Sequence, residues 1–323
     1  MLKKLAVAPL LLALSVSTQA LAANSAPMAV PITQTVPDAQ DVAYPGTMTL
    51  DIDASDTMRR AYRVTQVIPV ASGAKELTLL FPQWLPGNHG PRGPLAELVG
   101  VQFFVDGKPV EWKRDRVEVY AFHVMLPAGA KAVTAKFIHT SPLASNEGPM
   151  TPEMLNLQWE KMSLYPAGHY VRQIKVKPSV TLPQGWTPAT ALDGISMTGN
   201  RATWAETDYE TLVDSPIFAG KYFKKWDLGQ KVTLNVVADK AEQLEAKPEY
   251  IAAHSALVDE AKLAFGANHF DHYEFLLALS DKIGGIGLEH HRSSENQLEP
   301  EAFTEWDKQE WDRNLLPREY AQS

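Results

Sequence analysis

The sequence predicts a mainly β chain: an N-terminal antiparallel β-sandwich, followed by the start of a smaller α/β domain. Three observations lead to this fold class. Short apolar runs recur over residues 47–238, turns with Pro or Gly separate most of them, and helical spacing of apolar residues begins only after residue 239. Many short strands divided in this way are typical of a sandwich rather than of a parallel sheet.

The expected strands follow one another through the first region. Met48, Leu50 and Ile52 alternate with polar residues, as in a strand with one buried face. The turn at residues 106–109 joins the run 101–105 to Val110, which predicts a hairpin. The other expected strands cover residues 62–70, 77–81, 117–125, 133–138, 170–176, 201–204 and 231–237.

The α/β region over residues 239–323 begins with a predicted helix. Pro248 suits the first turn of this helix, and Gly266 follows Phe265 as a stop signal. A strand is expected over residues 272–279. The final residues again read as a helix, and we expect its Leu315 and Leu316 to lack packing partners.

The first residues have the pattern of a secretory signal peptide. A basic start at Lys3 and Lys4 precedes an apolar run over residues 5–16, and Ala20-Leu21-Ala22 is a small-x-small cleavage signal. We therefore expect cleavage after Ala22, a flexible leader over residues 23–46, and a periplasmic or secreted protein without a membrane contact. An uncleaved membrane anchor is the alternative.

Composition excludes several function classes. The formal net charge is −8, and no basic patch suggests nucleic-acid binding. The chain has no Cys, which excludes a cysteine nucleophile and disulfide bonds.

Glycine-rich and C-terminal segments together resemble a known family. The run Gly284-Gly285-Ile286-Gly287-Leu288-Glu289-His290 is followed by Asn314-Leu315-Leu316-Pro317-Arg318-Glu319, and Leu85-Pro86-Gly87 and Leu212-Val213-Asp214-Ser215-Pro216 precede both. In this order the segments are similar to the glycyl aminopeptidase family of zinc metallopeptidases (peptidase family M61). The resemblance implies a β-rich N-terminal domain, a thermolysin-like catalytic domain of which residues 239–323 are an incomplete start, and zinc as the family's cofactor.

The same resemblance implies a substrate-binding segment. Gly285, Glu289 and His290 would line the cleft, with Glu289 receiving the free amine of a peptide substrate. The alternative reading of this stretch is a glycine turn followed by a capping Glu.

The C-terminal helix departs from the family's His-Glu-x-x-His motif. Arg318 and Gln322 stand where the two zinc-binding imidazoles belong, and Glu319 stands at the position of the general base. An Arg side chain has no lone pair for a metal, and a Gln amide is a poor zinc ligand. We therefore expect that this chain binds no catalytic zinc and that Glu319 does not function as a base.

Other polar and aromatic residues offer weaker candidates. His269, Asp271 and His272 form a cluster that could bind a metal, whereas His290 and His291 would point to opposite faces of a strand. The eight tryptophans are scattered, which favours core positions over a sugar-stacking surface.

The preferred function is therefore the N-terminal portion of a secreted glycyl-aminopeptidase-like zinc metallopeptidase that is inactive in this copy, as a natural truncation or an incomplete reading frame. The expected partner is a peptide with a free N-terminus. The alternative is a non-catalytic peptide-binding or protein-interaction sandwich, which either holds peptides or pairs with a second protein chain that supplies a catalytic half. A carbohydrate-binding sandwich is the third option.

Overall fold

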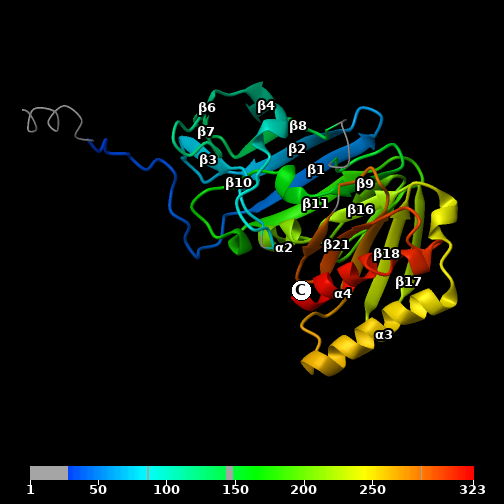
Figure 1. The fold of residues 1–323 in the computed structure, drawn as a ribbon. Coiled ribbons are helices and arrows are strands. Elements are labelled where there is room, and N and C mark those ends of the chain that lie inside the picture. Colours follow the sequence, from blue (N-terminus) through cyan, green and yellow to red (C-terminus); the bar gives the residue numbers. More distant parts are fainter. Residues whose placement is uncertain (1–27, 86, 143–147, 285) are drawn as a thin grey trace, which may run out of the picture. The chain divides into compact units, whose positions relative to one another are not determined.

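A computed structural model describes residues 28–85, 87–142, 148–284 and 286–323 (Figure 1). The chain forms two compact units, residues 1–35 and 36–323. In the first unit, residues 28–35 contain no helix or strand. The signal peptide predicted at residues 1–22 lies outside the described residues. All that follows concerns the second unit.

A nine-stranded sheet forms one layer of the sandwich. Its order is β13-β14-β11-β1-β2-β8-β4-β5, and β15 also pairs with β11. All of these pairs are antiparallel except β1–β11, which is parallel and departs from the expected antiparallel sandwich. The strands are β1 (Thr47–Asp56), β2 (Ala61–Pro69), β4 (Leu98–Val105), β5 (Lys108–Pro109), β8 (Ala132–Thr140), β11 (Lys175–Thr181), β13 (Ser196–Thr198), β14 (Arg201–Thr203) and β15 (Thr207–Asp208).

Two smaller antiparallel sheets share the core of this layer. One has the order β10-β3-β7-β6 and the other the order β12-β16-β9. Leu50 of β1, Phe122 of β7 and Leu155 of β9 belong to one hydrophobic cluster, so the three sheets are packed together. The strands are β3 (Glu76–Leu80), β6 (Trp112–Arg114), β7 (Ala121–Met125), β9 (Met154–Leu157), β10 (Tyr165–Pro166), β12 (Thr187–Ala189) and β16 (Ile217–Gly220).

A five-stranded mixed sheet with the order β17-β18-β19-β21-β20 forms the next layer. Strands β18, β19 and β21 are parallel to one another, and the two edge strands are antiparallel to their neighbours. The elements here are β17 (Tyr222–Asp227), β18 (Val232–Ala238), β19 (Tyr273–Leu279), β20 (Gly287–Glu289), β21 (Ser293–Leu298), α3 (Pro248–Phe265) and α4 (Leu315–Gln322). Helix α2 (Tyr209–Val213) lies before this sheet in the chain.

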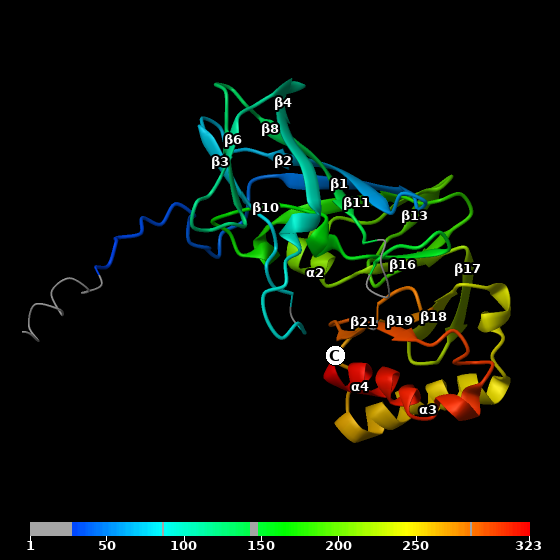
Figure 2. The same cartoon turned by 45° about the horizontal axis from the view of Figure 1, so that its top comes forward.

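Alternation of side chains along β19 explains how the layers pack. Phe275 and Leu277 join the hydrophobic cluster that contains residues of α3 and α4. Leu276 and Ala278 join a second cluster with Met154 of β9 and other residues of the three-stranded sheet. Since successive strand residues face opposite sides, one sheet face is covered by helices and the other by the sandwich (Figure 2).

Some predicted helices and strands have the same bounds in the structure, whereas others begin or end at different residues. Helix α3 begins at Pro248 and ends with Gly266 in the left-handed region at φ 71°, as expected. The strand expected over residues 117–125 is only β7, because the Asp115 carboxylate accepts hydrogen bonds from the backbone N–H groups of Val117 and Glu118 and forms a turn. The strand expected over residues 170–176 is shorter at its start, where a 3₁₀ helix covers Val171–Gln173.

The strand expected over residues 231–237 is β18, and it pairs with β19 rather than with the sandwich. The five-stranded sheet therefore crosses the predicted domain boundary at residue 238, and that division of the chain stays a prediction. The end of the predicted flexible leader is docked, because Tyr44 is buried and its backbone N–H donates to the Gln173 carbonyl over 2.9 Å.

The expectation that Leu315 and Leu316 lack partners was wrong. Leu316 is buried in the cluster under α4, and Leu315 packs against that cluster. Burial of a Leu side chain contributes about 1.5–3 kcal/mol, so α4 has its own hydrophobic anchor. No helix in the described part of the chain is both long enough and apolar enough to cross a membrane.

The tryptophans divide between core and surface. Trp159, Trp186 and Trp204 are buried in the sandwich core, as predicted. Trp84 and Trp311 are exposed, at 59% and 87%.

Candidate functional site

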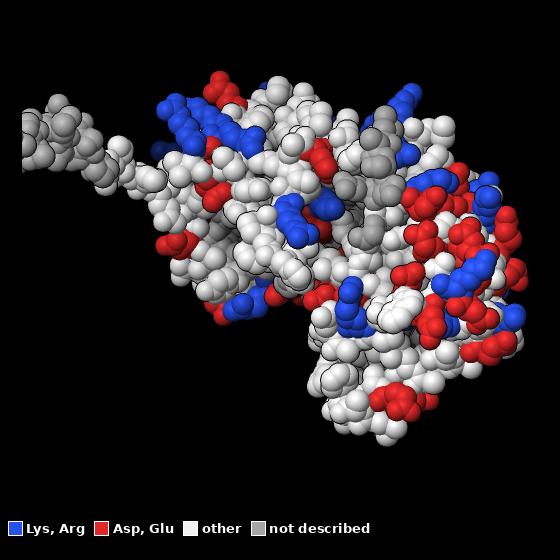
Figure 3. Space-filling model, viewed as in Figure 1, with Lys and Arg blue, Asp and Glu red and all other residues white. Residues whose placement is uncertain are grey.

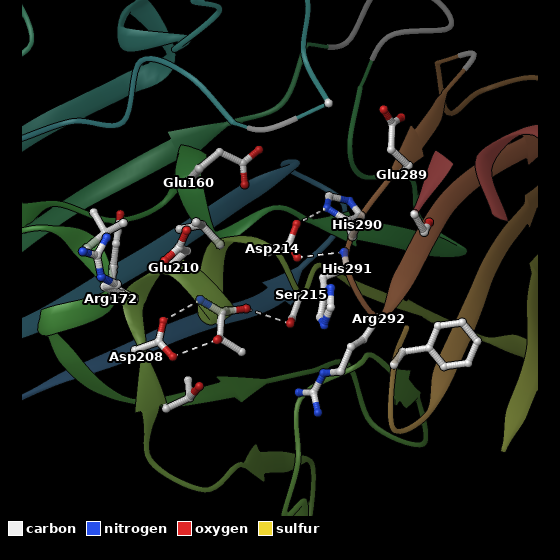
Figure 4. A pocket seen from close by; sticks show the side chains of 18 of the residues that line it. Glu160, Arg172, Asp208, Glu210, Asp214, Ser215, Glu289, His290, His291 and Arg292 are labelled. Carbon is white, nitrogen blue, oxygen red and sulfur yellow. Dashed lines mark hydrogen bonds and ion pairs between the residues drawn. The ribbon is translucent and has the colours of Figure 1, made fainter. Parts of the chain in front are cut away.

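A pocket of about 1480 Å³ lies where the sandwich, α2 and the β20–β21 segment meet. Figure 4 shows its side chains: Glu160 and Glu210 on one side, Asp214 and His290 in the middle, and Glu289 on the other side. A second pocket of about 630 Å³ shares Pro82, Gln83, Trp84 and Glu160 with the first. The predicted Glu289 and His290 therefore lie in one cavity, and Gly285 lies outside the described residues.

The buried ring of His290 links the two halves of this site. Its Nδ1 lies 2.9 Å from Oδ1 of Asp214, which follows α2, and its Nε2 lies 3.0 Å from Oε1 of Glu295 in β21. The second Asp214 oxygen accepts a hydrogen bond from the backbone N–H of His291 over 2.9 Å. Burial alone would lower the pKa of His290, but its hydrogen bonds to the two carboxylates and their charges raise the pKa to about 10. His290 is thus an imidazolium at neutral pH.

The sandwich contributes two amides to this network. The side-chain amides of Asn156 and Gln158 donate hydrogen bonds to the Glu295 carboxylate, the latter over 3.0 Å. Burial would raise the pKa of Glu295, but His290 and these amides hold it below its ordinary value. Sandwich and second sheet are therefore joined by a buried charged network, in which both ring nitrogens of His290 are engaged.

This network fixes the strand that presents Glu289. Both ring nitrogens of His290 are bonded to carboxylates, so the backbone of this strand is held in place. Glu289, the residue before His290, is therefore held at the pocket wall. Gly87 packs against the same strand: a Cβ there would lie 2.8 Å from Leu288 Cδ1 and 3.2 Å from the Glu289 carbonyl oxygen. Gly87 also has φ 87°, so glycine is required for both space and conformation. That Glu289 receives an amine stays a prediction.

Glu160 is a buried carboxylate that the sequence did not single out. It is 8% exposed, lines both pockets, and its Oε2 has no hydrogen-bond partner among the described residues. Burial raises its pKa to about 7, although the positive charge of Lys161 opposes this shift. Such a group ionises near neutral pH, where a ligand can control its charge.

The C-terminal helix does not fit a catalytic zinc ion. Arg318 donates to Glu319 Oε1 from Nη2 over 2.6 Å and from Nε over 2.7 Å, and the Glu319 side chain is buried. The Glu319 carboxylate, which was predicted to stand at the general-base position, is therefore engaged by a guanidinium, and neither Arg318 nor Gln322 offers an imidazole. Among the described residues, no group of three or more His, Asp or Glu side chains is placed to hold a metal ion.

The other candidate histidines make separate contacts. His272 lies between Asp193 and Glu274, at 3.2 and 3.5 Å. Asp271 pairs instead with Arg292 at 3.3 Å. His269 lines the large pocket, so the predicted His269-Asp271-His272 cluster does not converge on one point. On the face seen in Figure 3, Lys and Arg side chains are mixed with Asp and Glu on the right, and a small group of Lys and Arg side chains lies at the upper left.

The family model of the peptidase M61 N-terminal domain matches residues 49–221. The chain belongs to this peptidase family. The family identification made from the sequence is thus confirmed, and so is the mainly β fold class. No curated protein sequence matches the chain.

Three solved structures are similar to this chain to different degrees. An aminopeptidase N family protein from Idiomarina loihiensis is 17% identical with a TM-score of 0.71, and the match covers 86% of this chain and 47% of that one. Native yeast LTA4 hydrolase is 14% identical with a TM-score of 0.52, covering 87% and 43%. An M1 zinc metallopeptidase from Deinococcus radiodurans is 13% identical with a TM-score of 0.42, covering 82% and 61%. The M61 chain thus spans about half the length of the first two.

Sequence reasoning missed Asn156, Gln158, Glu160 and Glu295 as site residues. The available signal was weak: Glu295 is an acidic residue inside a strand flanked by Ser294, and Glu160 sits between Trp159 and Lys161. Acidic residues in such segments are usually solvent-exposed, so burial had to come from the fold.

Proposed function

We propose that this M61 chain binds peptides through their free N-terminus and does not hydrolyse them. The observation that carries the proposal is the Arg318–Glu319 pair, which occupies the general-base carboxylate at 2.6 Å. Both hydrogen bonds of the guanidinium end on Oε1 of that carboxylate, so this oxygen is already engaged and is not free to hold a water molecule. The peptidase step therefore has neither an available base nor imidazole ligands on this helix.

The pocket nevertheless keeps features for binding a peptide. Glu289 lines it, and its carboxylate has no ion pair among the described residues. A free ammonium group would make a charge-assisted hydrogen bond with that carboxylate. The edge strand β20 pairs with β21 on one side, and no described strand pairs with its other side, where a peptide strand could add beside Gly87 and α4. Secretion to the periplasm belongs to the same proposal and is supported by the pattern of the first 22 residues.

Two measurements on the purified chain test this function. Fluorescence anisotropy with a labelled tetrapeptide is expected to show binding with and without EDTA, and acetylation of the peptide's N-terminus should weaken it about tenfold. A glycyl chromogenic amide should not be hydrolysed with or without added zinc. Chelator-sensitive hydrolysis, or equal binding of the acetylated peptide, would contradict the proposal.

A further inference from the structure

Three acidic residues of the large pocket already have a cationic partner. Asp193 and Asp271 pair with Arg292 at 2.9 and 3.3 Å. Asp214 pairs with His290 at 2.9 Å. Each of these carboxylates is thus engaged with a cationic side chain of the protein, and Asp193 and Asp271 share the one guanidinium of Arg292.

Four further carboxylates line the pocket without an ion pair among the described residues, and one of them, Asp208, is engaged as the N-cap of α2, where it accepts hydrogen bonds from Thr211. Glu160, Glu210 and Glu289 make no ion pair among the described residues. Figure 4 shows Glu160 and Glu210 together on one side and Glu289 across His290 on the other. The pocket therefore has two separate acidic ends. Glu289 belongs to the proposed amine site, which leaves the other end unexplained.

The Glu160 end has the features of a built site rather than a solvated acidic surface. Glu160 is 92% buried, since only 8% is exposed, and its partnerless Oε2 belongs to a side chain that lines the cavity. A buried carboxylate without a partner destabilises the fold, and such groups cluster at functional sites.

Aromatic side chains accompany this carboxylate. Trp84 lines both pockets with Glu160, and 59% of it is exposed. Its indole N–H donates to the Asn88 carbonyl over 2.9 Å, which fixes the ring in its loop. Tyr165 lines the pocket as well. An organic cation is attracted both by carboxylates and by the faces of such rings, whereas a metal ion would need more oxygen ligands.

We infer that Glu160, with Glu210 and Trp84, binds the basic side chain of a peptide whose N-terminal amine lies at Glu289. The substrate class is thus a peptide with two cationic groups, a free amine and a Lys or Arg side chain. This inference rests on the proposed function, because Glu289 takes the amine.

Paired peptides that differ in one charge test the inference. The probes are labelled tetrapeptides Gly-Lys-Ala-Ala, Gly-Ala-Lys-Ala and Gly-Ala-Ala-Lys, each matched with the peptide carrying norleucine in place of Lys. For one of the three Lys positions, the Lys peptide is expected to bind about tenfold more tightly than the matching norleucine peptide. A difference of this size corresponds to one charge-assisted hydrogen bond. Equal affinities at all three Lys positions would overturn the inference while leaving the amine site intact. If no peptide with a free N-terminus binds, the proposed function itself has failed.

Glu→Gln variants then test which residues produce the preference for Lys peptides over norleucine peptides. Glu160→Gln keeps the size of the side chain and should abolish the difference between Lys and norleucine peptides, with little change for the norleucine peptide. Glu210→Gln should reduce the difference. Glu111→Gln is the matched control, because Glu111 is exposed and lies outside both pockets. Equal weakening of both peptides by Glu160→Gln, in protein with a wild-type circular dichroism spectrum, would show a structural role and overturn the inference.

Discussion

Arg318 Nη2 lies 2.6 Å from Oε1 of Glu319, its neighbour in the chain and the residue predicted to stand at the general-base position. The Glu319 side chain is 2% exposed, whereas that of Arg318 is 59% exposed. A buried carboxylate is thus neutralised by a guanidinium that reaches it from the surface. Arg318, which was predicted to stand at a metal-ligand position, thus stabilises the charge of the buried Glu319 carboxylate.

Removal of Arg318 should destabilise the fold. Arg318→Ala leaves the Glu319 carboxylate buried without its partner, at an expected cost of about 1–2 kcal/mol because the guanidinium is partly screened by solvent. Urea unfolding measures this change in the free energy of unfolding. Adding Glu319→Gln should recover part of it, since the buried charge is then absent. Lys308→Ala, which breaks the exposed pair with Glu305, is the control and should be nearly neutral.

The charge on His290 should make stability depend on pH in the alkaline range. Its pKa in the folded protein is about 10, above the ordinary value of 6.5, so its stabilising effect is complete below about pH 6.5 and is lost as pH rises through about 10. The free energy of unfolding of the wild type is expected to fall over this window.

His290→Gln isolates this effect. It leaves Asp214 and Glu295 without a cation between them and should cost about 3–5 kcal/mol at neutral pH. The part of the alkaline decline due to His290 should vanish in the variant. The exposed neighbour His291→Gln provides the control, with a wild-type pH profile. A decline of the same size in all three proteins would assign it to other groups.

The fold was predictable where local signals sufficed. Pro248 and Gly266 mark the ends of α3, because each residue has a strong local preference at a helix end. The parallel pairing of β1 with β11 joins Thr47 to Lys175 and has no local signature. The pairing of β18 also has no local signature. From its sequence alone β18 resembles the sandwich strands, but in the structure it pairs with β19.

The site was predictable only in part. The family resemblance singled out Glu289 and His290, and the structure places both at one pocket. The partners of His290 come from distant segments: Asp214 is 76 residues away in the chain. Whether a carboxylate such as Glu160 is buried depends on these long-range contacts, which composition and spacing do not reveal.

The conformation of the loop that carries Trp84 should depend on Gly93. A Cβ on Gly93 would lie 2.4 Å from the backbone oxygen of Pro82, so Gly93→Ala must displace the chain beside Trp84. We expect a loss of about 1–3 kcal/mol in the free energy of unfolding and weaker peptide binding. Gly90→Ala in the same loop meets nothing within 4 Å and is the matched control. Identical unfolding curves for the two variants would contradict the tight packing at Gly93.

Ionisation of Glu160 should lower the free energy of unfolding above neutral pH. A residue that destabilises the fold in this way is expected to be kept for binding a ligand. The pKa of Glu160 is raised from 4.5 to about 7, so the folded state holds a proton that the unfolded state releases. Stability is therefore highest below about pH 4.5 and is lost as pH rises through about 7, by about 3 kcal/mol for this group.

Glu160→Gln removes the titrating group and should therefore be more stable than the wild type near pH 8, with the advantage shrinking toward pH 5. The groups that act on Glu160 are Lys161, Glu295 and His290, which the substitution leaves in place. Thermal unfolding of both proteins across this range measures the difference, and Glu111→Gln should match the wild type throughout. A pH-independent difference would mean that Glu160 is charged at all these pH values. Gain of stability together with loss of the Lys preference would indicate that the buried carboxylate is kept for binding, because a residue that served only the fold would not destabilise it.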